Sequence, residues 1–224
     1  AAIILETIQG EGGINVAPKS WLRALRAITK KHGILMIIDD IQVGCGRTGK
    51  FFSFEEAGIK PDLITLSKSI GGYGLPMSLT LIKPAIDVWK PGQHTGTFRG
   101  NNLAFVTAAE AIVKYWKDSE SFEAAIETRS KLLFDTLNEV YQEHKDMIEE
   151  VRGRGLVAGI EFKHAELAGQ VSKEAFSKGL IIETCGAEDN IIKFLPPLTI
   201  EMNNFKQGLK LFKYAVESIK KTPK

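Results

Sequence analysis

Short apolar runs without polar alternation occur at residues 2–5, 34–38 and 63–66, and a further apolar stretch follows at 77–82. Runs of this length without alternation are typical of strands that are covered on both faces in a parallel sheet. The pattern therefore predicts an α/β arrangement for the first half of the chain.

An amphipathic pattern at residues 21–32 separates the first two apolar runs. Trp21, Leu25 and Ile28 fall on one face at helical spacing, and Gly33 follows as a stop signal. This segment is therefore predicted to form an amphipathic helix.

The second half of the chain mixes helical periodicity with short strands. The expected elements are helices at residues 102–118, 122–143, 169–177 and 203–220 and strands at 156–162, 180–183 and 191–194. Residues 152–155, with the sequence Arg-Gly-Arg-Gly, are expected to form a tight turn. We place a second, α+β domain at residues 120–224, after a first domain at 1–119.

Charge and composition exclude several classes of protein. The chain has 29 basic and 27 acidic residues, a formal net charge of +2, so nothing favours binding to nucleic acid or to a membrane surface. A hydrophobic fraction of 44% excludes a disordered chain, and the longest apolar run, five residues, is too short to span a membrane.

Because the sequence opens without Met in a strand-like run, we expect a C-terminal fragment of a longer protein.

The residue types that bind metals or form disulfides show no useful spacing. Cys45 and Cys185 lie far apart in the sequence, which favours a reducing, cytoplasmic location over a disulfide framework or a zinc site. The four histidines show no metal-ligand spacing, so no metal is expected. Gly153-x-Gly155-x-x-Ala158 superficially matches a dinucleotide fingerprint, but a strand is expected after it where that motif needs a helix.

Two charged residues follow predicted strands. Asp39, next to Asp40, ends the strand at 34–38, and Lys68 follows the strand at 63–66. Taken alone, each is better explained as an ordinary polar residue where a strand reaches solvent. In an open α/β sheet, however, ligands bind outside the carboxyl ends of the strands. A lysine that condenses with a carbonyl group and a carboxylate that keeps a pyridine nitrogen protonated are together what a pyridoxal phosphate site requires.

Four sequence motifs, two of which contain Asp39 and Lys68, are similar to motifs of a known protein family. Residues 37–49 (IIDDIQVGCGRTG), 60–68 (KPDLITLSK), 9–12 (QGEG) and 152–155 (RGRG) resemble the class III, or ω-amino-acid, aminotransferases. The resemblance covers the whole chain in the same order and spacing. It implies fold type I of the pyridoxal phosphate enzymes, with part of the large, mainly parallel-sheet domain followed by the small C-terminal α+β domain. It also implies that the cofactor is pyridoxal 5'-phosphate.

The resemblance assigns roles to individual residues around the cofactor. It makes Lys68 the catalytic lysine that bonds the cofactor and moves the substrate proton, and Asp39 the partner of the pyridine nitrogen. Ile41 is implied to pack on the ring and Gln42 to hydrogen-bond near the ring hydroxyl. Thr97 matches a threonine that reaches the cofactor phosphate across a dimer interface, which implies a homodimer or a higher homo-oligomer.

Two further residues are implied to bind the substrate. Glu11 matches a glutamate that pairs with a cationic residue when the substrate carboxylate is absent, and the position of that cation falls on Lys193. Many relatives have Arg at this place. An ammonium lacks the two-pronged grip of a guanidinium, so carboxylate binding is expected to differ here.

Within the family, residues 9–15, 40–46 and 96–102 resemble the diaminobutyrate–2-oxoglutarate aminotransferases of ectoine biosynthesis. This branch implies transfer of an amino group from L-glutamate to L-aspartate 4-semialdehyde, which gives L-2,4-diaminobutyrate and 2-oxoglutarate. The alternatives are another ω-aminotransferase, acting on ornithine, 4-aminobutyrate or a siderophore-linked diaminobutyrate, or a catalytically silent binding domain that has kept the fold. The substrates are small molecules in each enzymatic case, with no nucleic acid or membrane partner.

Overall fold

The computed structural model describes residues 1–72 and 74–220. The chain divides into two compact units. Ala1–Thr7 and Ala17–Glu123 form the first unit, and Ile8–Val16 joins the residues from Ala124 onward in the second. The division of the family's large and small domains at 1–119 and 120–224 stays a prediction, and residues 221–224 of it lie outside the described part.

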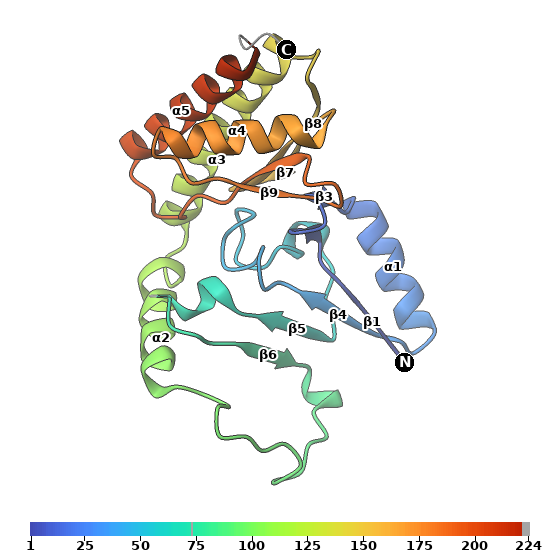
Figure 1. Cartoon of the computed structure of the whole chain (residues 1–224). Coiled ribbons are helices and arrows are strands. Elements are labelled where there is room, and N and C mark those ends of the chain that lie inside the picture. Colours follow the sequence, from blue (N-terminus) through green and yellow to red (C-terminus); the bar gives the residue numbers. More distant parts are fainter. Residues whose placement is uncertain (73, 221–224) are drawn as a thin grey trace. The chain divides into compact units, whose positions relative to one another are not determined.

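The first unit is built on a four-stranded sheet (Figure 1). Its order is β1 (Ala2–Leu5), β4 (Leu35–Asp39), β5 (Leu63–Leu66) and β6 (Leu79–Ile82). The first three strands are parallel, and β6 is antiparallel to β5. The apolar runs of the sequence therefore form the mainly parallel sheet that an α/β fold requires.

Helix α1 (Lys19–Lys31) packs on one face of this sheet, with a different side inward from the one expected. Leu22 and Thr29 are buried, whereas Trp21 and Ile28 are 48% and 55% exposed. Leu22 joins Met36 and Ile38 of β4 and three residues of the following loop, Phe54, Ala57 and Ile59, in the core of this unit. Of the expected face only Leu25 packs against this core, because two overlapping apolar stripes run along the helix and the sequence pattern does not distinguish them.

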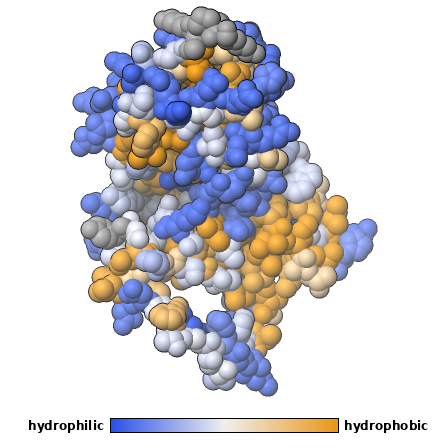
Figure 2. All heavy atoms as spheres, in the orientation of Figure 1, coloured by the Kyte–Doolittle hydropathy of each residue, from blue (hydrophilic) through white to orange (hydrophobic). Residues whose placement is uncertain are grey.

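The other face of the sheet carries apolar residues that the described part of the first unit leaves accessible. Ile4 of β1 is 60% exposed, and its register neighbours Ile37 of β4 and Leu63 of β5 are only half-buried. Figure 2 shows an apolar area over the sheet, in the region where Figure 1 draws β1, β4 and β5. A mainly parallel sheet is normally covered on both faces, so this surface is one that further protein would bury.

The rest of the first unit consists of short helical turns and α2. The remaining elements are η1 (Glu55–Ala57), η2 (Lys68–Gly71), η3 (Pro84–Ile86), α2 (Asn102–Trp116) and the first residues of α3 (Glu120–Glu143). Asn101 caps α2 by accepting a hydrogen bond from the Leu103 amide, 2.9 Å away. Within the described residues, no helix is long and apolar enough to cross a membrane.

The second unit has an antiparallel sheet of its own, in the order β7-β8-β10-β9. Its elements are β2 (Ile8–Gln9), β3 (Asn15–Val16), the rest of α3, β7 (Ile148–Arg154), β8 (Val157–Phe162), α4 (Ala165–Ser177), β9 (Glu183–Cys185), β10 (Ile191–Phe194) and α5 (Met202–Lys220). The tight turn expected at residues 152–155 is present but shorter, since residues 152–154 belong to β7 and the turn to β8 consists of Gly155 and Leu156. The strand expected at 180–183 starts only at Glu183. The polar residues 152–154 form a strand because their backbone pairs with β8, whereas the pairing of β9 with β10 includes only Glu183–Cys185.

The two faces of this second sheet have different coverings. Helices α3, α4 and α5 lie on one side (Figure 1), where Phe194 of β10 packs edge-to-face on Phe212 of α5 with ring centroids 4.9 Å apart. The antiparallel hairpin of β2 and β3 covers the other side. Ile14 of this hairpin is fully buried, and a Cβ placed on Gly159 of β8 would lie 3.1 Å from its side chain. The absence of a side chain at Gly159 therefore makes room for the hairpin.

Asp62, which precedes β5, joins several elements of the first unit, and its replacement is expected to destabilise the fold. Its carboxylate accepts hydrogen bonds from Arg26 of α1 (2.6 and 3.0 Å), from Lys83 (2.7 Å) and from the Met36 amide (2.9 Å). Burial raises the pKa of this carboxyl, but those hydrogen bonds lower the pKa by more. We expect Asp62→Asn to lower the free energy of unfolding by about 3 kcal/mol, because two cations lose their shared partner.

The lowered pKa also fixes the pH dependence of this effect. The stabilisation by Asp62 is fully present above the pKa of an unfolded aspartate and is lost as the pH falls toward the lowered folded value. Chemical denaturation of the full-length protein at pH 7 and below about pH 4 measures the size of the effect and its loss in acid. Asp135→Asn removes an ion pair of the same length from an exposed helix face and is expected to change stability by less than about 0.5 kcal/mol. Equal effects of the two variants would contradict this assignment.

Gly159→Ala is expected to disturb the packing of the β2–β3 hairpin against the sheet. The new methyl group would lie 3.0 to 3.2 Å from Ile191 and Ile14, both of which are packed in the core of the unit. Overpacking of this kind costs about 1 to 3 kcal/mol of stability. Gly169→Ala is the control, since a Cβ there meets nothing within 4 Å and alanine favours helix α4 by up to about 1 kcal/mol. Thermal unfolding would refute the packing argument if both variants were equally stable.

Candidate active site

The candidate cofactor residues of the first unit lie at the carboxyl ends of β4 and β5. Asp39 is the last residue of β4 and is paired in register with Thr65 of β5. Lys68 follows the end of β5 and begins η2. Because these two strands are parallel, Asp39 and Lys68 belong to the same edge of the sheet, where α/β proteins bind ligands.

The Asp39 carboxylate is half-buried and partly oriented by the chain itself. Its Oδ1 accepts a hydrogen bond from the Ile41 amide, 3.0 Å away, and no other described residue bonds to this carboxylate. The neighbouring Thr65 hydroxyl is buried and has no hydrogen-bond partner among the described residues. A buried hydroxyl without a partner is costly, so a polar group from outside this part of the chain is expected beside Asp39.

The loop after Asp39 is fixed by the second aspartate. Asp40 is 1% exposed, and its carboxylate accepts hydrogen bonds from the amide (3.0 Å) and the hydroxyl of Ser53. The Thr7 hydroxyl donates in turn to the Ser53 hydroxyl at 2.6 Å. Asp40 is thus a buried anchor for the loop that carries the half-buried Ile41 and Gln42. Asp40 is therefore neither a polar residue at a solvent-exposed strand end nor accessible as a general acid or base.

Burial also controls the chemistry of Cys45 and Arg47 in this loop. Burial and the nearby charge of Asp40 raise the pKa of the Cys45 thiol to about 12. Burial lowers the pKa of the Arg47 guanidinium to about 10. At neutral pH the thiol is therefore protonated and a poor nucleophile, while Arg47 stays charged.

Lys68 has an exceptional backbone conformation. Its φ angle is +51°, in the left-handed region that residues other than glycine rarely adopt, and its side chain is exposed. No described residue forms a hydrogen bond or ion pair with its ammonium group. Strain of this kind persists where the surrounding structure holds it, and it is concentrated at functional sites.

Helix α2 holds the turn that follows Lys68. The Thr107 hydroxyl donates to the Gly71 carbonyl at 2.9 Å. A Cβ on Gly72, whose φ is +71°, would lie 2.7 Å from the Thr107 carbonyl oxygen. The turn and the helix are therefore in close contact, and glycine is required at residue 72.

Thr97 lies in a different environment from the other candidate cofactor residues. It belongs to an irregular segment between η3 and α2, where it is exposed beside a fully exposed Phe98. No hydrogen bond joins Thr97 to Asp39 or Lys68 in the described structure. Its role at a cofactor phosphate stays a prediction.

The candidate substrate residues come together within the second unit. The Lys193 side chain, on β10, is only 2% exposed, and its ammonium group lies 2.6 Å from a carboxylate oxygen of Glu11 and 3.3 Å from one of Glu183. Burial lowers the pKa of Lys193, but the hydrogen bonds and charges of Glu11 and Glu183 raise it by more, so the pKa is higher than usual. The residue is a charged, buried lysine and not a solvated surface lysine.

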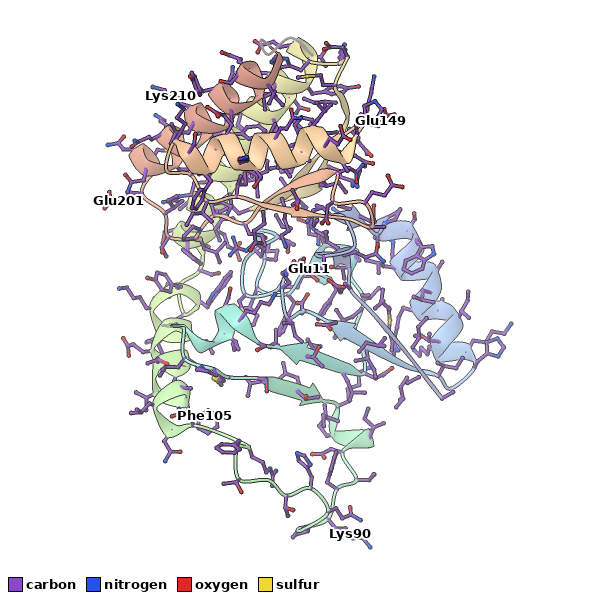
Figure 3. All side chains as sticks on the ribbon, viewed as in Figure 1. Glu11, Lys90, Phe105, Glu149, Glu201 and Lys210 are labelled. Carbon is purple, nitrogen blue, oxygen red and sulfur yellow. The ribbon has the colours of Figure 1, made fainter. Side chains whose placement is uncertain are left out.

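The loop that carries Glu11 (labelled in Figure 3) is held in place from the sheet. Arg152 of β7 donates through Nε to the Gly13 carbonyl at 2.8 Å, and the Gly186 amide donates to the Glu11 carbonyl at 3.0 Å. Arg152 is itself paired with Glu161 of β8. The pairing of Glu11 with Lys193 therefore rests on a backbone that is fixed independently of the ion pair.

Four residues of these two groups were missed by the sequence reasoning. They are Asp40 as a loop anchor, Thr65 beside Asp39, Arg152 behind the Glu11 loop, and Glu183 opposite Lys193. The signal for Glu183 would have been the register of β9 and β10, which depends on long-range pairing. Within the described residues, no three His, Cys, Asp or Glu side chains gather as a metal site.

The donor set of the first unit fits pyridoxal phosphate. The cofactor presents a ring nitrogen that a carboxylate can pair with, a carbonyl that an amine can condense with, and polar ring substituents. Asp39 offers a carboxylate with capacity left, Lys68 offers an ammonium without a protein partner, and Thr65 offers an unpaired hydroxyl. These three groups match what the cofactor needs.

Comparison with known proteins agrees with this chemistry. Residues 1–216 match the family model described as aminotransferase class-III. Diaminobutyrate–2-oxoglutarate transaminases of Streptomyces avermitilis and Vibrio parahaemolyticus are 54% and 51% identical over 96% and 98% of this chain. This chain spans about half the length of those relatives, 51% and 52%.

Solved structures show the same fold. The N-acetylornithine aminotransferase of Stenotrophomonas maltophilia superposes with a TM-score of 0.85 at 32% identity, over 98% of this chain and 57% of that structure. The ornithine aminotransferase of Plasmodium yoelii gives 0.84 at 33% identity, over 97% and 57%. The expected α/β fold of type I is confirmed, as is the expected cofactor, since the family depends on pyridoxal phosphate. The chain belongs to the class III aminotransferase family.

Proposed function

We propose that the protein containing this chain transfers an amino group from L-glutamate to L-aspartate 4-semialdehyde, giving L-2,4-diaminobutyrate and 2-oxoglutarate. The observation that carries the proposal is the parallel pairing of β4 and β5, with Asp39 at the end of one strand and Lys68 just beyond the other. The names of the most similar curated relatives support the choice of substrates. Formation of ectoine from the product is part of the same proposal.

The cofactor, when bound, supplies a pyridine ring that accepts the electron pair of the substrate carbon. In the proposed reaction Asp39 keeps the ring nitrogen protonated. Lys68 binds the cofactor covalently through Nζ and carries the proton to and from the substrate carbon. Ile41, Gln42 and Thr97 hold the cofactor, and Glu11 and Lys193 receive the substrate.

Two alternative functions can be distinguished from the proposed one. Another ω-aminotransferase, acting on ornithine, 4-aminobutyrate or a siderophore-linked diaminobutyrate, would use the same Asp39 and Lys68. A silent binding domain would have no need of a strained, unpartnered lysine at residue 68, and that observation favours an enzyme. Profiling of the full-length protein with amino donors and acceptors separates the three, and lack of glutamate-dependent turnover of the semialdehyde would refute the proposal.

We further propose a cytoplasmic homodimer. The two cysteines are buried and free, as expected in a reducing compartment. Large apolar side chains are exposed in the first unit between η3 and the end of α2, in a density that favours a protein interface. They include Val88 (78% exposed), Phe98 (99%), Leu103 (69%) and Val106 (67%). A sedimentation measurement on the full-length protein tests this assembly.

Lys68→Ala in the full-length protein is expected to abolish covalent attachment of the cofactor and to lower turnover roughly a thousandfold or more. The reason is that no other candidate residue offers an amine at this strand end. Borohydride reduction followed by mass spectrometry locates the modified lysine. Lys30→Ala, on the exposed end of α1, is the control and should leave both unchanged. A cofactor adduct on a different lysine would overturn the assignment.

Asp39→Asn is expected to leave the cofactor bound but to slow the proton transfer severely. An amide cannot keep the ring nitrogen protonated, so a loss of several kcal/mol is expected, roughly a thousandfold in rate. Single-turnover absorbance measurements resolve this step. Asp118→Asn, at an exposed position between α2 and α3, is the matched control. Rates within a few-fold of the unaltered protein would be inconsistent with the role given to Asp39.

A further inference from the structure

Lys193 is shared between two carboxylates that come from separate parts of the second unit. Glu11 reaches it from the hairpin loop, and Glu183 from β9. Glu183 and Lys193 are directly opposite each other in the antiparallel pairing of β9 and β10, so both side chains project from the same face of the sheet. The register of the sheet therefore fixes the second ion pair, whatever Glu11 does.

The charges of this cluster do not cancel. One ammonium and two carboxylates leave a net charge of −1. The Lys193 side chain is 2% exposed, whereas those of Glu11 and Glu183 are 72% and 70% exposed. A ligand from solvent therefore meets the carboxylates before it meets the ammonium.

We infer that Glu183 is a specificity-determining residue, which acts with Glu11 to withhold Lys193 from substrate carboxylates. The inference rests on the proposed function, in which Lys193 receives the carboxylate of glutamate or 2-oxoglutarate. A carboxylate that binds Lys193 must compete with both glutamates and approach their negative charge. A substrate without a carboxylate on its reacting carbon leaves the cluster undisturbed. Glu183 therefore biases the site toward the semialdehyde and the terminal amine and against the dicarboxylates.

Glutarate is a suitable probe because it carries both carboxylates of the donor and has no amino group to transfer. We expect Glu183→Gln to bind glutarate about two- to fivefold more tightly in calorimetric titration of the full-length protein, the range for removal of one solvent-exposed charge interaction. Lys193→Ala should weaken glutarate binding. Glu139→Gln is the matched control, since it removes an exposed carboxylate 3.2 Å from Lys213 on a helix pair elsewhere in the unit. It should leave glutarate binding unchanged.

The kinetics of the separate half-reactions distinguish a role of Glu183 in substrate specificity from a purely structural role. In Glu183→Gln we expect the KM for glutamate and for 2-oxoglutarate to fall by about the same two- to fivefold, with kcat and the KM for 2,4-diaminobutyrate unchanged. A uniform change for all substrates would indicate damage to the fold and would count against the inference.

Two results would overturn the inference, and neither depends on the identity of the reaction. One is glutarate affinity in Glu183→Gln that is equal to or weaker than that of the unaltered protein. The other is no glutarate binding to any of the variants, which would show that Lys193 is not a carboxylate site. A protein that binds glutarate as expected but transfers no amino group would refute the proposed function and leave the role of Glu183 intact.

Discussion

The parallel pairing of β4 with β5 is the constraint on which the chemistry of this chain depends. It aligns the ends of two strands that are joined by a long connection, so that Asp39 and Lys68 emerge at one edge of the sheet. Asp40 then fixes the loop after β4 through Ser53, and α2 fixes the turn after β5 through Gly71. The turn that carries the strained Lys68 is held by α2 and by the packing of Ile70 against Cys45 of the loop after β4, and neither contact involves the Lys68 side chain.

In the second unit, a hairpin from a distant part of the sequence brings charged residues together. The hairpin of β2 and β3 precedes the rest of its unit by more than a hundred residues in the sequence. Ile14 of the hairpin packs against β8 at Gly159, where the absence of a side chain leaves room for it. Arg152 fixes the loop backbone, which leaves the Glu11 side chain to meet Lys193. In the proposed function a substrate carboxylate displaces Glu11 from Lys193, and with the loop backbone fixed only the Glu11 side chain has to move.

The sequence alone predicted the residues that end strands but few of the contacts between distant segments. Asp39 and Lys68 were found because buried parallel strands are short apolar runs whose ends are obvious. Strand β7 was missed because its residues are mostly polar and its pairing partner defines it. Glu183 was missed for the same reason, since the register of β9 on β10 is a property of the sheet. The inward face of α1 was predicted only in part, because two apolar stripes overlap along the helix: Leu25 packs against the core as expected, but Leu22 is the residue that the sheet buries.

If the ends of β4 and β5 bind one cofactor, a crystal structure of the full-length protein grown with pyridoxal 5'-phosphate will show both residues in contact with it. We expect continuous electron density from Lys68 Nζ to the cofactor, with an Asp39 carboxylate oxygen within hydrogen-bonding distance of the ring nitrogen. Density that joins the cofactor to another lysine, or a ring nitrogen that faces a group other than Asp39, would contradict it.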